Sequence, residues 1–238
     1  CAPARAEPIG MTSEVGHAAV LRLLRLLAAC GVALVVVVIA SSAYLRLTQA
    51  GLSCANWPAC YGSIVQAGGV TTAERGARLA HRLSASAVGI VLLALFAIAL
   101  AQRPRLSQQA LLAGAGLSVA ALLATIGAIT TGYVEDGRLL PAVTVVNLGG
   151  GFALLALLAL LRQTVAQAPA SKPRSVPTRP ARGLALLAGC ALAAIIVQIV
   201  LGALVSAKFA ALACPAFPLC VTEWPPGGLV ETLDPFTP

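Results

Sequence analysis

Five long apolar runs limit how this 238-residue chain can fold more than any other feature. They cover residues 21–44, 81–101, 109–132, 142–161 and 183–206. Each has about the 20 residues that a helix needs to cross the hydrocarbon core of a bilayer. Only 10% of the residues are charged, against about 25% in soluble domains, so one aqueous core could not hide these side chains. The sequence therefore predicts an all-α fold, a polytopic membrane helical bundle with five transmembrane helices.

The charged residues predict how the bundle is oriented. With the N-terminus inside, ten of the 16 Lys and Arg residues but only two of the eight acidic residues fall on the cytoplasmic side, and the outer side is neutral. The net charge of +8 is therefore a positive-inside bias, and no motif suggests a nucleic-acid partner. The first apolar run resembles a signal peptide, but it exceeds the usual apolar core of about 7–15 residues, which favours a retained helix.

The spans divide the chain into five segments. A Pro- and Arg-rich stretch after the fourth span reads as a cytoplasmic linker. The predicted segments are a cytoplasmic N-terminal segment 1–20, a four-helix bundle 21–162 with an outer loop 45–80, the linker 163–182, a fifth helix 183–206 and an outer segment 207–238.

An internal repeat relates the two outer loops. Residues 51–60 and 211–220 share the pattern small-Leu-small-Cys-x-x-aromatic-Pro-x-Cys, and each copy follows an apolar run. Parallel repeats of helix sets are a known membrane architecture. The pattern predicts the first four-helix half of an eight-helix pseudo-repeat plus one helix of the second half. We therefore expect that the sequence is truncated after the fifth helix.

Four cysteines form two pairs in these loops, and each pair has five intervening residues. The pairs are Cys54 with Cys60 and Cys214 with Cys220. Both are predicted on the oxidising side of the membrane, where disulfides persist. A simple disulfide that closes the loop and a redox-active pair both remain open, whereas zinc sites usually have a shorter spacing. Cys30 and Cys190 lie inside apolar runs and are expected to be buried as small hydrophobic side chains.

His81 and Asn147 are the polar residues that could bind a cofactor inside the bundle. His81 begins the second apolar run at its outer end, and imidazole is a common axial ligand of haem iron. The alternative is an interfacial histidine that faces lipid headgroups. Asn147 is predicted at a similar depth in the fourth span, and bundles build cofactor sites from facing helices. Asparagine is, however, a poor iron ligand.

A group of charged residues precedes the second apolar run. Glu74 and Arg78 are four residues apart, a spacing that allows an ion pair on a helix. Arg78 and Arg82 are candidates to bind haem propionates, because guanidinium groups pair well with carboxylates. Long basic side chains that extend from a membrane surface are the alternative explanation.

Residues 44–54 and 57–62 together closely resemble the first outer loop of haem A synthases. His81, Arg82 and Leu83 look like the His-Arg at the start of that family's second helix, and residues 212–220 resemble its second cysteine loop. The resemblance implies eight helices in two pseudo-repeated halves, each with a pair of histidines for a haem. It implies that the N-terminal half oxidises the C8 methyl of haem O to a formyl group, and that the other half holds haem b.

The resemblance also implies a membrane haem-dependent oxidoreductase for cytochrome c oxidase biogenesis in the bacterial plasma (inner) membrane. Its partners would be haem O, haem O synthase, oxidase assembly factors and membrane lipid, with a possible homo-oligomer. Two positions depart from the family pattern. Asn147 stands where a histidine is usual, and Arg78 stands where an acid is usual, which leaves Glu74 as the candidate catalytic carboxylate. A membrane thiol-redox protein and a non-catalytic haem-binding assembly relative are the alternatives.

Overall fold

The computed structural model describes residues 9–49, 71–102, 106–130, 141–167 and 182–207, and each of these ranges holds one long helix. The helices are α1 (Ile9–Gln49), α2 (Thr72–Ala101), α3 (Ser107–Thr130), α4 (Pro141–Gln167) and α5 (Arg182–Ala207). All five are long and apolar enough to cross a membrane. The predicted all-α membrane fold with five spans is thus confirmed.

Three helices extend well beyond their apolar runs. α1 has 41 residues and begins within the predicted N-terminal segment, and α4 continues to Gln167, inside the predicted linker. α2 begins at Thr72 because Thr71 and Glu74 form a capping box before the apolar run starts. An apolar run marks only the part of a helix that lies in lipid, so it underestimates the length of the helix. His81 consequently lies inside α2 and not at its beginning.

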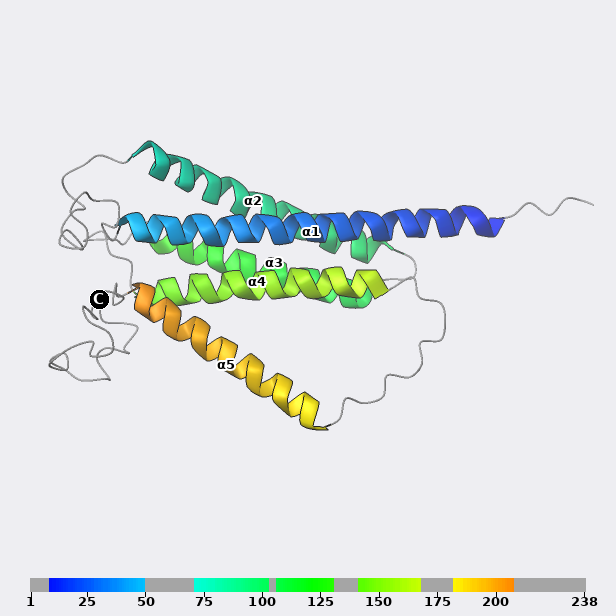
Figure 1. Cartoon of the computed structure of the whole chain (residues 1–238). Helices are drawn as coiled ribbons and strands as arrows, with labels where there is room; N and C mark the ends of the chain where they lie inside the picture. The colour runs from blue at the N-terminus through cyan, green and yellow to red at the C-terminus, as the bar shows by residue number, and fades with distance from the viewer. Residues whose placement is uncertain (1–8, 50–70, 103–105, 131–140, 168–181, 208–238) are drawn as a thin grey trace, which may run out of the picture.

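The first four helices form an antiparallel bundle (Figure 1). α1 packs against α2 and α4, and α3 packs against the same two helices, so α2 and α4 are diagonal to each other. The main packing partner of α5 is α4. α5 is tilted relative to α4, so the start of α5 lies away from α4, whereas the end of α5 lies beside it. We call the end of the bundle with the start of α2 the His81 end, and the opposite end the Arg25 end.

Each helix of the bundle buries one narrow stripe of side chains. The buried residues of α2 follow one another at intervals of three or four: Ser84, Val88, Leu92, Leu95 and Ala99. The same spacing on α4 joins Gly151, Leu154, Leu158, Leu161 and Val165, and Thr144 lies seven residues, about two turns, before Gly151. Such stripes bring one face of each helix into a shared core.

Glycines let the helices approach closely within this core. A Cβ atom at Gly116 of α3 would lie 2.9 Å from the Leu92 side chain of α2. A Cβ atom at Gly150 of α4 would lie 2.6 Å from the Leu123 side chain of α3. Small residues at helix contacts are typical of membrane bundles, where close packing takes the place of the hydrophobic effect.

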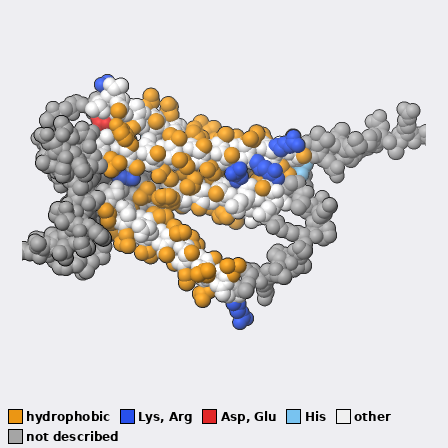
Figure 2. Space-filling model, viewed as in Figure 1, with side chains coloured by type: hydrophobic (Ala, Val, Ile, Leu, Met, Phe, Trp, Pro, Cys, Tyr) orange, Lys and Arg blue, Asp and Glu red, His pale blue; other side chains and the backbone are white. Residues whose placement is uncertain are grey.

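The outer faces of the helices are largely apolar, as expected of a protein whose solvent is lipid. Figure 2 shows hydrophobic side chains along the helices, with basic side chains gathered at the Arg25 end and at the start of α5. Cys30 and Cys190 are both exposed free cysteines, so the prediction that they are buried is wrong. The reason is that apolar runs in lipid carry hydrophobic residues on every face, and burial in the bundle depends on rotation about the helix axis.

Candidate functional site

His81 lies on the core-facing stripe of α2, one turn before the buried Ser84. Its side chain is partly buried and contacts α1. Nδ1 of the ring is 3.3 Å from the carbonyl oxygen of Val38 and 3.5 Å from Oγ of Ser41. The histidine is therefore held between two helices and does not extend freely toward headgroups.

The contact with Val38 determines which ring nitrogen can bind a metal. A carbonyl oxygen only accepts hydrogen bonds, so this bond requires the proton on Nδ1. The hydroxyl of Ser41 donates to the carbonyl oxygen of Val37 at 2.7 Å, and its own oxygen remains an acceptor for the ring. A neutral imidazole protonated at Nδ1 keeps a free lone pair on Nε2. Metal-binding histidines are usually oriented by such a bond to a backbone carbonyl.

Asn147 takes the position between Thr144 and Gly151 on the buried stripe of α4. Its side chain is partly buried, and its amide makes no hydrogen bond to the described part of the chain. α4 is diagonal to α2, so Asn147 and His81 lie on stripes that face the same core. That the two side chains face each other across this core stays a prediction.

The contacts that α1 makes with α2 and α4 show how deep His81 and Asn147 lie along the bundle. Val38 and Ser41 contact His81, and the Ile39 side chain lies 3.2 Å from a Cβ position at Gly151 of α4. His81 is therefore level with Gly151, and Asn147 lies one turn, about 6 Å, nearer the His81 end. The similar depth predicted from the sequence agrees to within about one turn.

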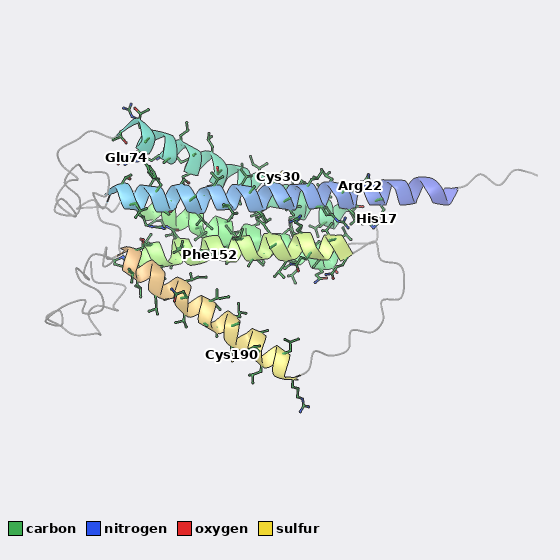
Figure 3. All side chains as sticks on the ribbon, in the orientation of Figure 1. His17, Arg22, Cys30, Glu74, Phe152 and Cys190 are labelled. Carbon is green, nitrogen blue, oxygen red and sulfur yellow. The ribbon has the colours of Figure 1, made fainter. Side chains whose placement is uncertain are left out.

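Glu74 has a structural partner of its own. Its Oε2 accepts a hydrogen bond of 2.8 Å from the backbone N–H of Thr71, and its own N–H donates to Thr71 Oγ1 at 3.2 Å. Figure 3 shows Glu74 at the start of α2, at the opposite end of the bundle from His17 and Arg22. Glu74 precedes His81 by seven residues, or about 10 Å along the helix. The carboxylate is thus engaged in starting α2.

Arg78 and Arg82 are not brought into the core. Both side chains are exposed on α2, away from the stripe that carries His81. Their charges are therefore in solvent or at the membrane surface. The helix has 3.6 residues per turn, so His81 and Arg82 point in directions about 100° apart even though they are adjacent in the sequence.

Arg46 is a partly buried cation at the His81 end that the sequence analysis did not single out. It lies in the last turn of α1, within the apolar span Gly16–Thr48, and is partly buried. Its Nη1 donates to Oγ of Ser42 at 3.2 Å, whereas its Nε is buried and has no hydrogen-bond partner. An arginine at the end of an apolar run was the available signal, because ionisable residues in membrane spans are often functional.

The cysteine pairs predicted in the loops lie outside the described residues. Within the described helices, no group of three or more His, Cys, Asp or Glu residues is placed to hold a metal ion. His81 is therefore the one imidazole at the His81 end in the described part of the chain, because His17 lies near the Arg25 end.

Comparison with known proteins shows the family of this chain. Residues 25–236 match the model of the cytochrome oxidase assembly protein family (COX15-CtaA). The chain belongs to this family. It is 29% identical over 217 residues to a haem A synthase of Shewanella oneidensis, in an alignment that covers 84% of this chain and 62% of the relative. The chain thus spans less than two thirds of that relative's length, and no solved structure matches it. The family predicted from the loop motifs is confirmed.

Proposed function

We propose that this chain acts in haem A synthesis, binding haem O and oxidising its C8 methyl to a formyl group for cytochrome c oxidase. The observation that carries the proposal is the imidazole of His81, which is oriented by the Val38 carbonyl on a core stripe. The family match and the likeness to a haem A synthase support the choice of haem chemistry. The bacterial inner membrane is the proposed location, with haem O synthase and oxidase assembly factors as proposed partners.

The residues at the His81 end fit a haem. His81 would hold the iron of a haem through Nε2, because Nδ1 is engaged with the carbonyl oxygen of Val38. Asn147 lies on the opposite stripe with no hydrogen-bond partner among the described residues, and its amide is a poor iron ligand. His81 would therefore be the one histidine that holds a haem in this half. Iron with an open position is suited to oxidation chemistry, whereas two strong ligands are suited to electron transfer.

The other predicted site residues have smaller parts in this proposal. Glu74 starts α2 and thereby holds the helix that carries His81. Arg78 and Arg82 stay candidates for contacts at the membrane surface, where solvent weakens pairing with carboxylates. Haem b is proposed for the second half of the family's repeat, beyond the helices described for this chain.

Asn147 also favours a second candidate function, a haem-binding assembly protein without oxidase activity. Its amide stands where the family pattern has a histidine and does not bind iron well. This candidate predicts that the chain retains haem O unchanged. The two functions therefore differ in the haem that is extracted and not in whether haem is bound.

The test is to produce the chain in a bacterial host that makes haem O but no haem A. Haems are extracted from the purified protein and separated by chromatography with mass detection. We expect a formyl haem from the wild type, and no retained haem O or haem A from His81→Ala. His17→Ala is the matched control, because it removes the imidazole at the other end of the bundle. Haem O without its formyl product would support the assembly protein, and no haem at all would exclude both functions.

A further inference from the structure

We propose that Arg46 binds a propionate carboxylate of the haem held by His81 and so orients the macrocycle in the bundle. The inference rests on the proposed function and adds a residue that determines how the haem sits. It concerns a cation on α1, whereas the iron ligand is on α2. Failure of the inference is therefore separable from failure of haem binding itself.

The unsatisfied donor of Arg46 is the first observation. Nε is buried and has no acceptor, and within the described helices Nη1 bonds only to the neutral hydroxyl of Ser42 on α1. A buried donor without an acceptor is costly, and the cost is larger for a charged group. A positive charge near the C-terminal end of α1 is favourable, but this effect does not need burial, because an arginine that extends into water would have it too. Burial of Nε is therefore better explained by an acceptor that approaches from the core.

Arg25 also has a buried Nε without a partner, so the acceptors around Arg25 can be compared with those around Arg46. Its Nη2 donates to two carbonyl oxygens at the end of α4, those of Val165 at 3.3 Å and Ala166 at 2.9 Å. These oxygens carry the partial negative charge of a helix C-terminus. Arg25 thus bonds to acceptors with partial negative charge on a neighbouring helix, whereas Arg46 has no such acceptor on another described helix.

The direction of Arg46 is the second observation. It follows Ile39 by seven residues, close to two turns, so the two share a face of α1. Ile39 contacts α4 at Gly151. Arg46 therefore lies on the side of α1 that faces α4, and it is nearer the His81 end than the residues that contact His81. A carboxylate of a ligand between α2 and α4 would meet this side of α1.

The chemistry of the described residues favours a carboxylate from outside the helices. Among the described ranges only Glu14 and Glu74 are acidic. Glu14 lies toward the Arg25 end of α1, and Glu74 is engaged with Thr71. Arginine presents a planar fork of N–H donors that matches the two oxygens of a carboxylate. A haem propionate supplies such oxygens, whereas the vinyl and methyl edges of the macrocycle do not.

The experiment compares haem with a derivative that has no free carboxylate. The full chain is purified in dodecyl maltoside micelles, which carry no phosphate, and is titrated with ferric protoporphyrin IX or with its dimethyl ester. Binding is followed by the Soret absorption of the wild type, Arg46→Gln, Arg46→Lys and Arg22→Gln. Arg22 is an exposed arginine near the other end of α1, so its variant controls for the loss of one charge.

We expect Arg46→Gln to weaken haem binding by about tenfold to a hundredfold, the range typical of hydrogen bonds to charged groups. The dimethyl ester should bind the wild type more weakly by a similar factor, and Arg46→Gln should not weaken it further. Arg46→Lys should lie between, because it keeps the charge but loses the fork. Arg22→Gln should bind both ligands as the wild type does, and the apo forms of all variants should keep their helicity.

Three outcomes would overturn the inference while leaving the proposed function in place. In the first outcome, the wild type binds the dimethyl ester as tightly as haem. This result does not depend on the folding of any variant. Arg46→Gln weakens haem and ester equally, which indicates a general structural role. An effect of Arg46 that appears only when phosphatidylglycerol is added assigns the cation to a lipid phosphate. A wild type that binds neither haem nor ester would instead overturn the proposed function, and this inference with it.

Discussion

At the scale of single residues, the orientation of His81 depends on two atoms of another helix. The carbonyl oxygen of Val38 requires the proton on Nδ1, and Ser41 Oγ lies beside the same nitrogen. Both groups belong to α1, so the nitrogen available for iron on α2 is decided by contacts between helices. The same end of the bundle has the amide of Asn147, without a hydrogen-bond partner among the described residues, and the buried Nε of Arg46.

Two substitutions of Glu74 separate a capping role from a catalytic one. Glu74→Gln keeps an acceptor for the Thr71 N–H but removes the charge, and glutamine is accepted in capping boxes. We expect Glu74→Gln to keep its yield of formyl haem, because the carboxylate is engaged two turns away from His81. Glu74→Ala should lower the unfolding free energy by about 1 kcal/mol, the typical effect of losing a cap. Loss of formyl haem in Glu74→Gln with unchanged stability would establish the catalytic role predicted from the sequence.

Asn147→His tests whether the two stripes face one haem. The amide has no described hydrogen-bond partner, so its replacement breaks no bond, and a second imidazole would complete axial ligation. We expect the ferric protein to change from a high-spin to a six-coordinate low-spin absorption spectrum. Asn147→Gln is the control, because it extends the side chain without adding an imidazole. An unchanged spectrum in Asn147→His would show that position 147 does not reach the iron.

At the scale of helices, close approach and end contacts hold the bundle together. Gly116 and Gly150 let leucines of neighbouring helices fill the space where their own side chains would be. At the Arg25 end, Arg25 of α1 supplies donors to the last carbonyl groups of α4. The final carbonyls of a helix have no partners within the helix, so this contact joins the two helices where they end.

Two adjacent glycines of α4 offer a matched test of this packing. A Cβ atom at Gly150 would lie 2.6–3.0 Å from three atoms of the Leu123 side chain, whereas one at Gly149 has nothing within 4 Å. We expect Gly150→Ala to lower the free energy of unfolding by about 1–3 kcal/mol, as overpacking does. Gly149→Ala should be neutral or stabilising by up to about 1 kcal/mol, because alanine favours helices.

The measurement for both glycine variants is loss of helicity on titration with a denaturing detergent. Leu123→Ala in the Gly150→Ala background should recover part of the stability, because it removes the atoms that the new methyl group meets. Equal stability of the two single variants would contradict the close approach of α3 and α4.

At the scale of the whole molecule, the first four helices pack closely together, whereas α5 is mostly exposed. α5 buries Ala203 and leaves residues 182–198 exposed, and its contacts are with α4 near the His81 end. All the contacts of His81 and Arg46 described above belong to α1 and α2. The stripes that carry His81 and Asn147 are therefore complete without α5.

Removal of everything after Gln167 should consequently leave haem binding intact. We expect the shortened chain to bind ferric protoporphyrin IX within about threefold of the full chain, because no described contact of the site is lost. The Soret titration in micelles measures this directly. The Asn147→His spectrum, recorded in both lengths, controls for the integrity of the α2 and α4 stripes. A loss of binding of more than tenfold in the shortened chain would show that α5 or the residues after it support the site.

The amino-acid sequence by itself determined the membrane class, the five helices and the family. These follow from apolar runs, sparse charge and loop motifs, which are local properties of the chain. Only the tertiary structure decided that Cys30 faces outward and that His81 packs against Val38 of α1. In lipid every face of a helix is apolar, so periodicity carries little information about rotation. The rotation is decided by close packing between helices, and that packing determines which polar side chains share the core with His81.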